Sequence, residues 1–343
     1  MKNTKSIAIL FAFLAAVAYA ISIPASKVLL THVGPTYMAA FLYLGAGVGV
    51  GVLFISNTSR GREEGFLSRG DFPYVIGMIV LDIIAPILLM IGISEGTSSN
   101  ASLLSNFEIV ATTIIALCVF NESVTRRLWL AVALITLSSI ILSLGGAESF
   151  DFSYGSLFVL AATVCWGFEN NCTRMISSKS TYEIVTIKGL GSGLGAMVIA
   201  FAISEQFPKL SYIAVIMLLG FVAFGLSIFM YVRAQSVLGA AKTSAYYAVA
   251  PFVGAFLSFV FLRESLTFSY TVALVIMIAG AVLVVVDTLI QNHTHVHGHT
   301  FVHTHDGITH LHTIQHEHDH NHYISDSQHN HQHDTKELEK ELI

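Results

Sequence analysis

The feature that most constrains this chain is a succession of long apolar blocks separated by short polar connections. Ten blocks occupy approximately residues 6–30, 36–55, 73–93, 99–120, 127–145, 154–176, 182–203, 210–233, 241–262 and 267–290. A bilayer core about 30 Å thick needs roughly 20 mostly apolar residues per helix. Only 11% of the residues are charged, and the blocks are apolar on nearly every side, which excludes a soluble bundle of amphipathic helices. The sequence therefore predicts an all-α integral membrane protein with ten transmembrane helices.

The positive charges predict the orientation of these helices. With ten crossings, both termini lie on one side of the membrane. The Lys and Arg residues that flank the blocks on that side are Lys2, Lys5, Arg60, Arg62, Arg69, Arg126, Arg127, Arg174, Lys179, Arg233 and Lys242, whereas the other side carries Lys209 and Arg263, with Lys27 near a helix end. Because cytoplasmic loops carry the excess of positive charge, we expect both termini to be cytoplasmic in a multi-pass protein of the cell membrane.

The apolar blocks repeat in order after five helices. The segment AVAYAISIPASKVLL aligns with ATVCWGFENNCTRMI, so that Tyr19 meets Trp166 and Lys27 meets Arg174. A glycine ladder at residues 45, 47, 49 and 51 returns at 189, 191, 193 and 195, and FNESVT returns as LRESLT. Five is an odd number, so the second copy crosses the membrane in the opposite sense, as in the inverted repeats of many transporters. Small residues at such spacing let helices approach closely, and static packing is the simpler interpretation of the ladder.

These segments resemble the EamA-type members of the drug/metabolite transporter superfamily over residues 1 to about 287. The resemblance rests on the helices of Lys27 and Trp166, on LLSNFEIVATTIIALCVFNESVT and on SAYYAVAPFVGAFLSFVFLRESLT. A Glu-Pro pair typical of the family is split here into Glu108-Ile109 and Ala250-Pro251. The resemblance implies two five-helix repeats at 1–147 and 148–290, followed by a tail at 291–343. It also implies secondary transport of amino acids, other metabolites or drugs.

Several polar residues fall at membrane depth, where a charge costs about 2.5–3.5 kcal/mol on insertion scales. Glu108 lies on a polar stripe that includes Ser105, and a carboxylate there could couple proton entry to solute exit. For Asp82 and Glu169 an internal salt bridge that fixes helix packing is the equal alternative. The residues predicted to form the solute or ion pathway are Asp82, Ser105, Glu108, Glu169, Asn170, Lys188, Tyr246, Tyr247 and Pro251.

The tail after residue 290 is rich in histidine, mostly as His-x-His. Neutral imidazole binds zinc, nickel, copper and cobalt, and Glu317 and Asp319 could add oxygen ligands. We expect the tail to be disordered without metal, because it is of low complexity. The predicted metal ligands are His293, His295, His297, His299, His303, His305, His310, His312, His316, His318, His320 and His322.

The leading hypothesis is a secondary transporter that exports a small metabolite, amino-acid-like or drug-like, by alternating access. The alternatives are an exporter of divalent metal (Zn, Ni or Co) that uses the tail, and a metal-responsive membrane sensor. We expect no enzymatic activity and no catalytic residue, because no nucleophile–base pair or metal motif appears in the helices. Transport should require no cofactor, although the tail could hold a divalent metal. The expected partners are the solute, the lipid bilayer and metal ions, with no nucleic acid; the oligomeric state stays open, a homodimer being one alternative.

Overall fold

The structure is a computed structural model that describes residues 2–56, 65–120, 125–144, 153–176, 179–238, 243, 246–305 and 308–323, with backbone only from residue 288 onward. The chain divides into two compact units, Met1–Val285 and Val286–Ile343. The first is a helical bundle and the second contains two strands.

All ten predicted blocks contain helix in the described part of the chain. The first half consists of α1 (Lys2–Ala20), α2 (Ser22–Leu29), α3 (Pro35–Ser56), η1 (Arg69–Asp71), α4 (Phe72–Glu95), α5 (Ser98–Leu104), α6 (Phe107–Phe120) and α7 (Arg126–Ser143). The second half consists of α8 (Tyr154–Met175), α9 (Thr181–Ala202), α10 (Leu210–Gly220), the π-helical turn η2 (Phe221–Leu226), α11 (Ser227–Leu238), α13 (Ala250–Leu262) and α14 (Phe268–Leu289). Pairs such as α1 and α2, or α5 and α6, share one block and are separated by a local break.

Eight of the described helical segments are long and apolar enough to cross a membrane. They correspond to eight of the ten predicted blocks. The sixth block is α8, which is 22 residues long but carries the polar run Glu169-Asn170-Asn171 near its end. The ninth block contains α13, which is apolar but only 13 residues long because the helix is interrupted before Ala250. The chain is thus a multi-pass integral membrane protein whose membrane unit is all-α.

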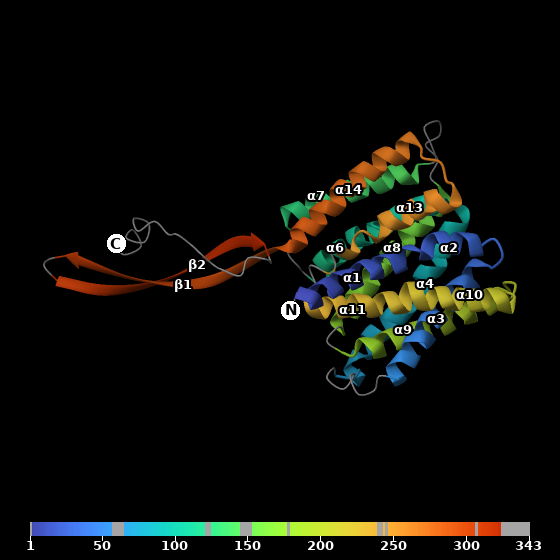
Figure 1. Ribbon diagram of the computed structural model, residues 1–343, viewed down its shortest axis with the longest axis horizontal. Helices are drawn as coiled ribbons and strands as arrows, with labels where there is room; N and C mark the ends of the chain where they lie inside the picture. The colour runs from blue at the N-terminus through green and yellow to red at the C-terminus, as the bar shows by residue number, and fades with distance from the viewer. Residues whose placement is uncertain are drawn as a thin grey trace. The chain divides into compact units, whose positions relative to one another are not determined.

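Helix packing in the bundle has a two-fold pattern that follows the sequence repeat (Figure 1). The second helices of the two halves, α3 and α9, pack against each other. The third helix of each half packs against the first helix of the other, as α4 with α8 and α11 with α1. The fifth helices, α7 and α14, are joined by a hydrogen bond from Ser138 Oγ to the carbonyl of Ala273 at 2.7 Å. The two copies therefore exchange equivalent contacts.

The crossing of α3 and α9 depends on the glycine ladders. A Cβ atom placed on Gly189 would lie 2.5 Å from the Cα atom of Gly47, and one on Gly47 would lie 2.5 Å from the backbone nitrogen of Leu190. Only glycine permits this approach of two backbones. The ladders thus have the packing role that the simpler interpretation gives them.

Charged side chains bind helix ends at one face of the bundle, which we call the Lys27 end. Lys27 Nζ donates to the last carbonyl groups of α4 at 2.7–3.1 Å. The carboxylate of Glu205 accepts from the first N–H groups of α3 at 3.2 Å. Glu264 accepts from the N–H groups of Ser98 and Ser99, at 2.7 and 2.9 Å. Each contact satisfies backbone groups that a helix end leaves without an intrahelical partner.

These contacts show that the two halves are inverted. In the first half, the first and third helices end at the Lys27 end; in the second half, the second and fourth helices end there, because Glu205 follows α9 and Glu264 follows α13. At the opposite face, the Lys179 end, Gly65 pairs with Lys179 as an isolated bridge. The predicted inversion of the repeat is therefore present in the helix directions. Of the repeat partners of Glu264 and Lys27, Glu122 lies outside the described residues, and the side chain of Arg174 is not described.

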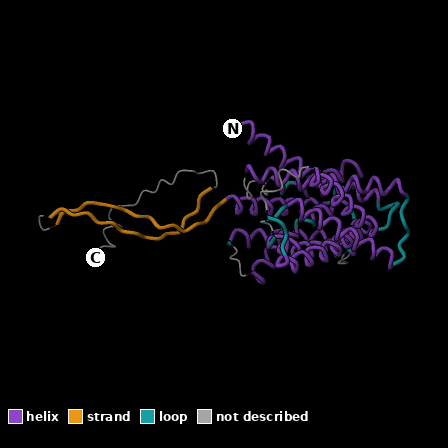
Figure 2. Tube along the Cα trace, turned by 90° about the horizontal axis from the view of Figure 1, so that it is seen from below, coloured by secondary structure: helices purple, strands orange, loops and turns teal. Residues whose placement is uncertain are grey.

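The second unit contains strands β1 (Ile290–His305) and β2 (Ile308–Tyr323), which pair antiparallel from Ile290↔Tyr323 to His305↔Ile308. Figure 2 shows the two strands in orange. The structure describes these residues as paired strands, whereas the sequence predicts a tail that is disordered without metal. The alternation of histidine with Thr and Val has the period of two that a strand requires, and β-branched residues favour strands. Residues 324–343 lie outside the described part of the chain.

Candidate functional site: a cavity between the two halves

A cavity of about 280 Å³ lies inside the helical bundle. Both halves of the chain contribute to its wall. The lining residues are Tyr19, Tyr43, Ala46, Ser105, Asn106, Glu108, Ile109, Trp166, Glu169, Asn170, Val185, Lys188, Gly189, Ala223, Phe224, Ile228, Tyr247, Ala248, Ala250 and Pro251. Its volume lies near the lower limit for ligand pockets, roughly 300 Å³, which suits a small solute.

Irregular helix geometry borders the cavity on three elements. Ser105 and Asn106 form a turn between α5 and α6, and Ala248 lies in the turn that precedes α13. These two turns occupy equivalent places in the aligned halves. The π-helical turn η2 supplies Phe224 from a third element. Interrupted helices and π-helical turns are common at membrane binding sites and functional sites, respectively.

A buried ion cluster forms one wall. Lys188 Nζ lies 3.0 Å from Asp82 Oδ2 and 2.9 Å from Glu169 Oε1. Asp82 and Glu169 are 1% and 2% exposed. Tyr43 Oη and Trp166 Nε1 also donate to Asp82 Oδ1, at 3.1 and 3.2 Å. Buried charges persist only when they are paired and hydrogen-bonded, so Lys188 is engaged by both carboxylates.

Glu108 forms a separate acidic wall. It lies in the first turn of α6, where the helix dipole favours a negative charge. Asn170 Nδ2 donates to Glu108 Oε1 at 2.6 Å and also to Thr112 Oγ1 at 3.4 Å. Among the described residues, Asn170 is the one hydrogen-bond partner of the Glu108 carboxylate, and no Lys or Arg pairs with it. Glu108 therefore retains acceptor capacity toward the cavity.

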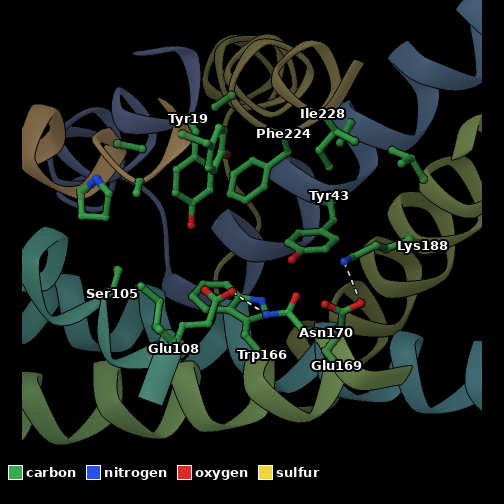
Figure 3. Close-up of a pocket in the computed structure, with 18 of the residues that line it drawn as sticks. Tyr19, Tyr43, Ser105, Glu108, Trp166, Glu169, Asn170, Lys188, Phe224 and Ile228 are labelled. Carbon is green, nitrogen blue, oxygen red and sulfur yellow. Dashed lines mark hydrogen bonds and ion pairs between the residues drawn. The ribbon is translucent and has the colours of Figure 1, made fainter. Parts of the chain in front are cut away.

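Aromatic rings complete the wall. The ring centroid of Phe224 lies 5.7 Å from that of Tyr19 and 5.6 Å from that of Tyr43, and Tyr19 and Tyr247 are 5.9 Å apart. Figure 3 shows Tyr19, Phe224 and Tyr43 facing Glu108 across the cavity, with Trp166 beside the carboxylate. Aromatic faces attract cations and pack against apolar groups. The cavity thus combines one carboxylate with several aromatic surfaces.

The structure brings most of the predicted pathway residues together. Ser105, Glu108, Glu169, Asn170, Lys188, Tyr247 and Pro251 line the cavity. Asp82 does not line the cavity itself but contacts three lining residues, Lys188, Tyr43 and Trp166. For Asp82 and Glu169 the salt-bridge alternative describes the contacts observed. Tyr246 lies elsewhere, with its ring 5.4 Å from that of Phe13, because adjacent residues of a helix turn to different sides.

Sequence reasoning did not select Tyr19, Tyr43, Trp166 or Phe224 as cavity residues. Tyr19 and Trp166 could have been found, because they are equivalent positions of the two halves and both carry large aromatic rings with a polar atom. Tyr43 and Phe224 had no such signal, since aromatic residues are frequent in apolar helices.

Where side chains are described, no group of three or more His, Cys, Asp or Glu could hold a metal ion. The twelve histidines predicted as ligands lie in β1 and β2, of which only the backbone is described.

The chain is similar to known membrane proteins over most of its length. A model of the EamA-like transporter family matches residues 6–144 and again residues 153–286. An uncharacterized transporter from Methanothermobacter thermautotrophicus is 24% identical over 291 residues, covering 78% of this chain and 82% of that protein. A solved structure described only as a crystal structure of a protein has a TM-score of 0.60 at 14% identity, covering 82% of this chain and 96% of that chain. That likeness concerns the fold alone.

Proposed function

We propose that this chain, which belongs to the EamA-like transporter family, exports a small organic solute by alternating access and binds it in the cavity around Glu108. The family makes it a membrane transporter and not an enzyme. The single observation that carries the proposed site is the position of the cavity, lined by both inverted halves and bordered by interrupted helices. Inverted repeats place solutes at this kind of junction.

The charges around the cavity favour a solute that carries an ammonium group. Among the described lining residues Lys188 is the one cation, and it is engaged by Asp82 and Glu169. A solute carboxylate would therefore lack a cation to pair with. An ammonium group would find Glu108 and the aromatic rings, which together provide a charge-assisted hydrogen bond and cation–π contacts. This proposal narrows the expected amino-acid-like or drug-like cargo to amines with an apolar body.

Energy for export would come from an ion gradient or from the solute gradient. Glu108 is the proposed coupling residue, because a buried carboxylate is stabilised either by a proton or by a cation beside it. Entry of a proton would then accompany release of the solute.

The proposed orientation places the Lys179 end and both termini in the cytoplasm of a cell-membrane protein. It is supported by the excess of Lys and Arg on that side of the helices.

The test is transport into proteoliposomes by the full chain, with three solutes of similar shape: phenethylamine, phenylalanine and 2-phenylethanol. We expect saturable transport of the amine, and little transport of the amino acid or the alcohol. Glu108→Gln should reduce amine transport roughly ten- to hundredfold, since a hydrogen bond to a charged group contributes about 1.5–3 kcal/mol. Glu95→Gln, an exposed change outside the cavity, is the matched control.

The solute specificity, the role of Glu108 and the coupling to protons can each fail separately. Equal transport of the three solutes by both Glu108→Gln and the unmodified protein would overturn the amine and Glu108 assignments but leave transport through the cavity standing. Transport of the amine that is independent of a pH gradient would remove proton coupling alone.

Metal export is the rival function, and deletion of residues 291–343 distinguishes it. We expect the shortened chain to transport the amine at the rate of the full chain. If zinc, nickel or cobalt were transported by the full chain and not by the shortened one, the metal-export alternative would replace the present proposal.

A further inference from the structure

The histidines of the two strands follow a parity rule. In β1 every histidine has an odd number, from His293 to His305, and in β2 every histidine has an even number, from His310 to His322. The register pairs odd positions with even ones, for example His293 with His320. Because successive residues of a strand alternate between its two faces, all twelve histidine positions fall on one face. The positions of the other face hold no histidine.

The sequence between the strands supports the same arrangement independently. The dipeptide Asp306-Gly307 separates β1 from β2, and Asp-Gly between two alternating segments is a strong signal for a two-residue hairpin connection. Histidine parity changes from odd to even across this dipeptide, as it must if the histidines of both strands are to share a face.

The register brings histidine positions together in sets of four. Directly opposed residues of an antiparallel pair have Cα atoms about 4.5–5.5 Å apart, and the next position on the same face is about 7 Å along the strand. His295 and His297 are opposed by His318 and His316, respectively. Near the connection, His303 is opposed by His310. Zinc takes four ligands and accepts imidazole nitrogen at about 2.0–2.1 Å.

We propose that β1 and β2, residues 290–305 and 308–323, form a histidine face that binds Zn²⁺, or another imidazole-binding divalent ion such as Ni²⁺ or Co²⁺, between the two strands. Glu317 and Asp319, the predicted oxygen donors, occupy positions of the other face, so the face of the histidine positions holds neither of them. The bound ion also stabilises the strand pair. A two-stranded hairpin alone is marginal in water, and an ion that binds only the paired form increases its population.

The test uses variants that have the same amino-acid composition as the unmodified chain but place selected histidines on the other face of the strand pair. A one-strand exchange transposes neighbours in β1: His295→Val with Val296→His, and His297→Gly with Gly298→His. A two-strand exchange adds the opposed transpositions in β2: His316→Gln with Gln315→His, and His318→Glu with Glu317→His. The register then opposes the histidines at 296 and 298 to those at 317 and 315, on the other face.

Zinc binding to the full chain in detergent is measured by calorimetry. The one-strand exchange should lose a tightly bound ion or weaken it by at least an order of magnitude, since even loss of an outer-shell partner costs on the order of 10–100-fold. The two-strand exchange should restore it. Equal zinc binding by all three proteins would mean that composition alone binds the metal, and the proposal would fall.

Hydrogen exchange detected by mass spectrometry provides the second readout. Zinc should slow amide exchange across β1 and β2 in the unmodified chain and in the two-strand exchange, but not in the one-strand exchange. Zinc binding without slower exchange in the unmodified chain would overturn the claim that the ion organises the strand pair. Neither readout depends on transport, so the result is separate from the proposed function.

Discussion

Lys188 shows how single residues shape the cavity of this transporter. Its ammonium group contacts Asp82 and Glu169, two carboxylates that are almost completely buried. Removing one partner from a buried ion group leaves an uncompensated charge, whereas removing a matched pair does not. The cluster therefore holds α4, α8 and α9 together, whereas the Glu108 carboxylate pairs with no Lys or Arg among the described residues.

Lys188→Met should accordingly destabilise the protein by about 3–5 kcal/mol. Thermal unfolding in detergent measures the change. Adding Asp82→Asn to Lys188→Met should recover part of the loss, since one unpaired charge is removed. Lys179→Met is the control. The ion pair between Lys179 Nζ and Asp71 Oδ2 is 3.7 Å long and partly exposed, so its loss should lower the free energy of unfolding by at most about 1 kcal/mol. If Lys188→Met and Lys179→Met lower the unfolding temperature by the same amount, the cluster has no special structural role.

At the scale of helices, packing in the bundle depends on how closely backbones approach and on how helix ends are satisfied. The α3–α9 crossing is fixed by Gly47 and Gly189. At the Lys27 end, one lysine and two glutamates bind the ends of α4, α3 and α5. All of these contacts join segments that are far apart in the sequence, so they determine which helices are neighbours.

Gly189→Ala should destabilise the protein by about 1–3 kcal/mol, the typical cost of overpacking. The added methyl group would lie 2.5 Å from backbone atoms of Gly47, which cannot move without shifting a helix. Gly51→Ala belongs to the same ladders and is the matched control, because its nearest neighbour is a threonine methyl group at 3.3 Å. Equal unfolding temperatures for the two variants would contradict a tight crossing at Gly189.

At the scale of the whole bundle, the inverted halves create two chemically different ends. The Lys27 end is held by side-chain contacts to helix termini. The Lys179 end carries most of the flanking positive charge of the sequence. In secondary transporters built from inverted repeats, the two halves can exchange conformations and open either end in turn.

Cysteine labelling in intact cells tests the arrangement of these ends. In a background with Cys118, Cys165 and Cys172 replaced by serine, Gln206→Cys should react with an impermeant thiol reagent added outside. Arg69→Cys, at the other end, should react only after the cells are opened. Both positions are exposed. Labelling of both from the same side would contradict the inversion, and labelling in the reverse sense would overturn only the orientation.

The sequence alone determined the membrane class, the helical blocks and the five-helix repeat, because apolar length and repeat spacing are local properties of the chain. Seven of the twenty residues that line the cavity were also found from the sequence, most of them as polar groups in apolar blocks. Tertiary structure decided which polar groups meet: Asp82 and Lys188 are 106 positions apart and pair only because α4 and α9 cross. It also separated Tyr247 from its neighbour Tyr246 and placed Tyr43 and Phe224 in the wall, since these outcomes depend on helix rotation and packing, which no local pattern specifies.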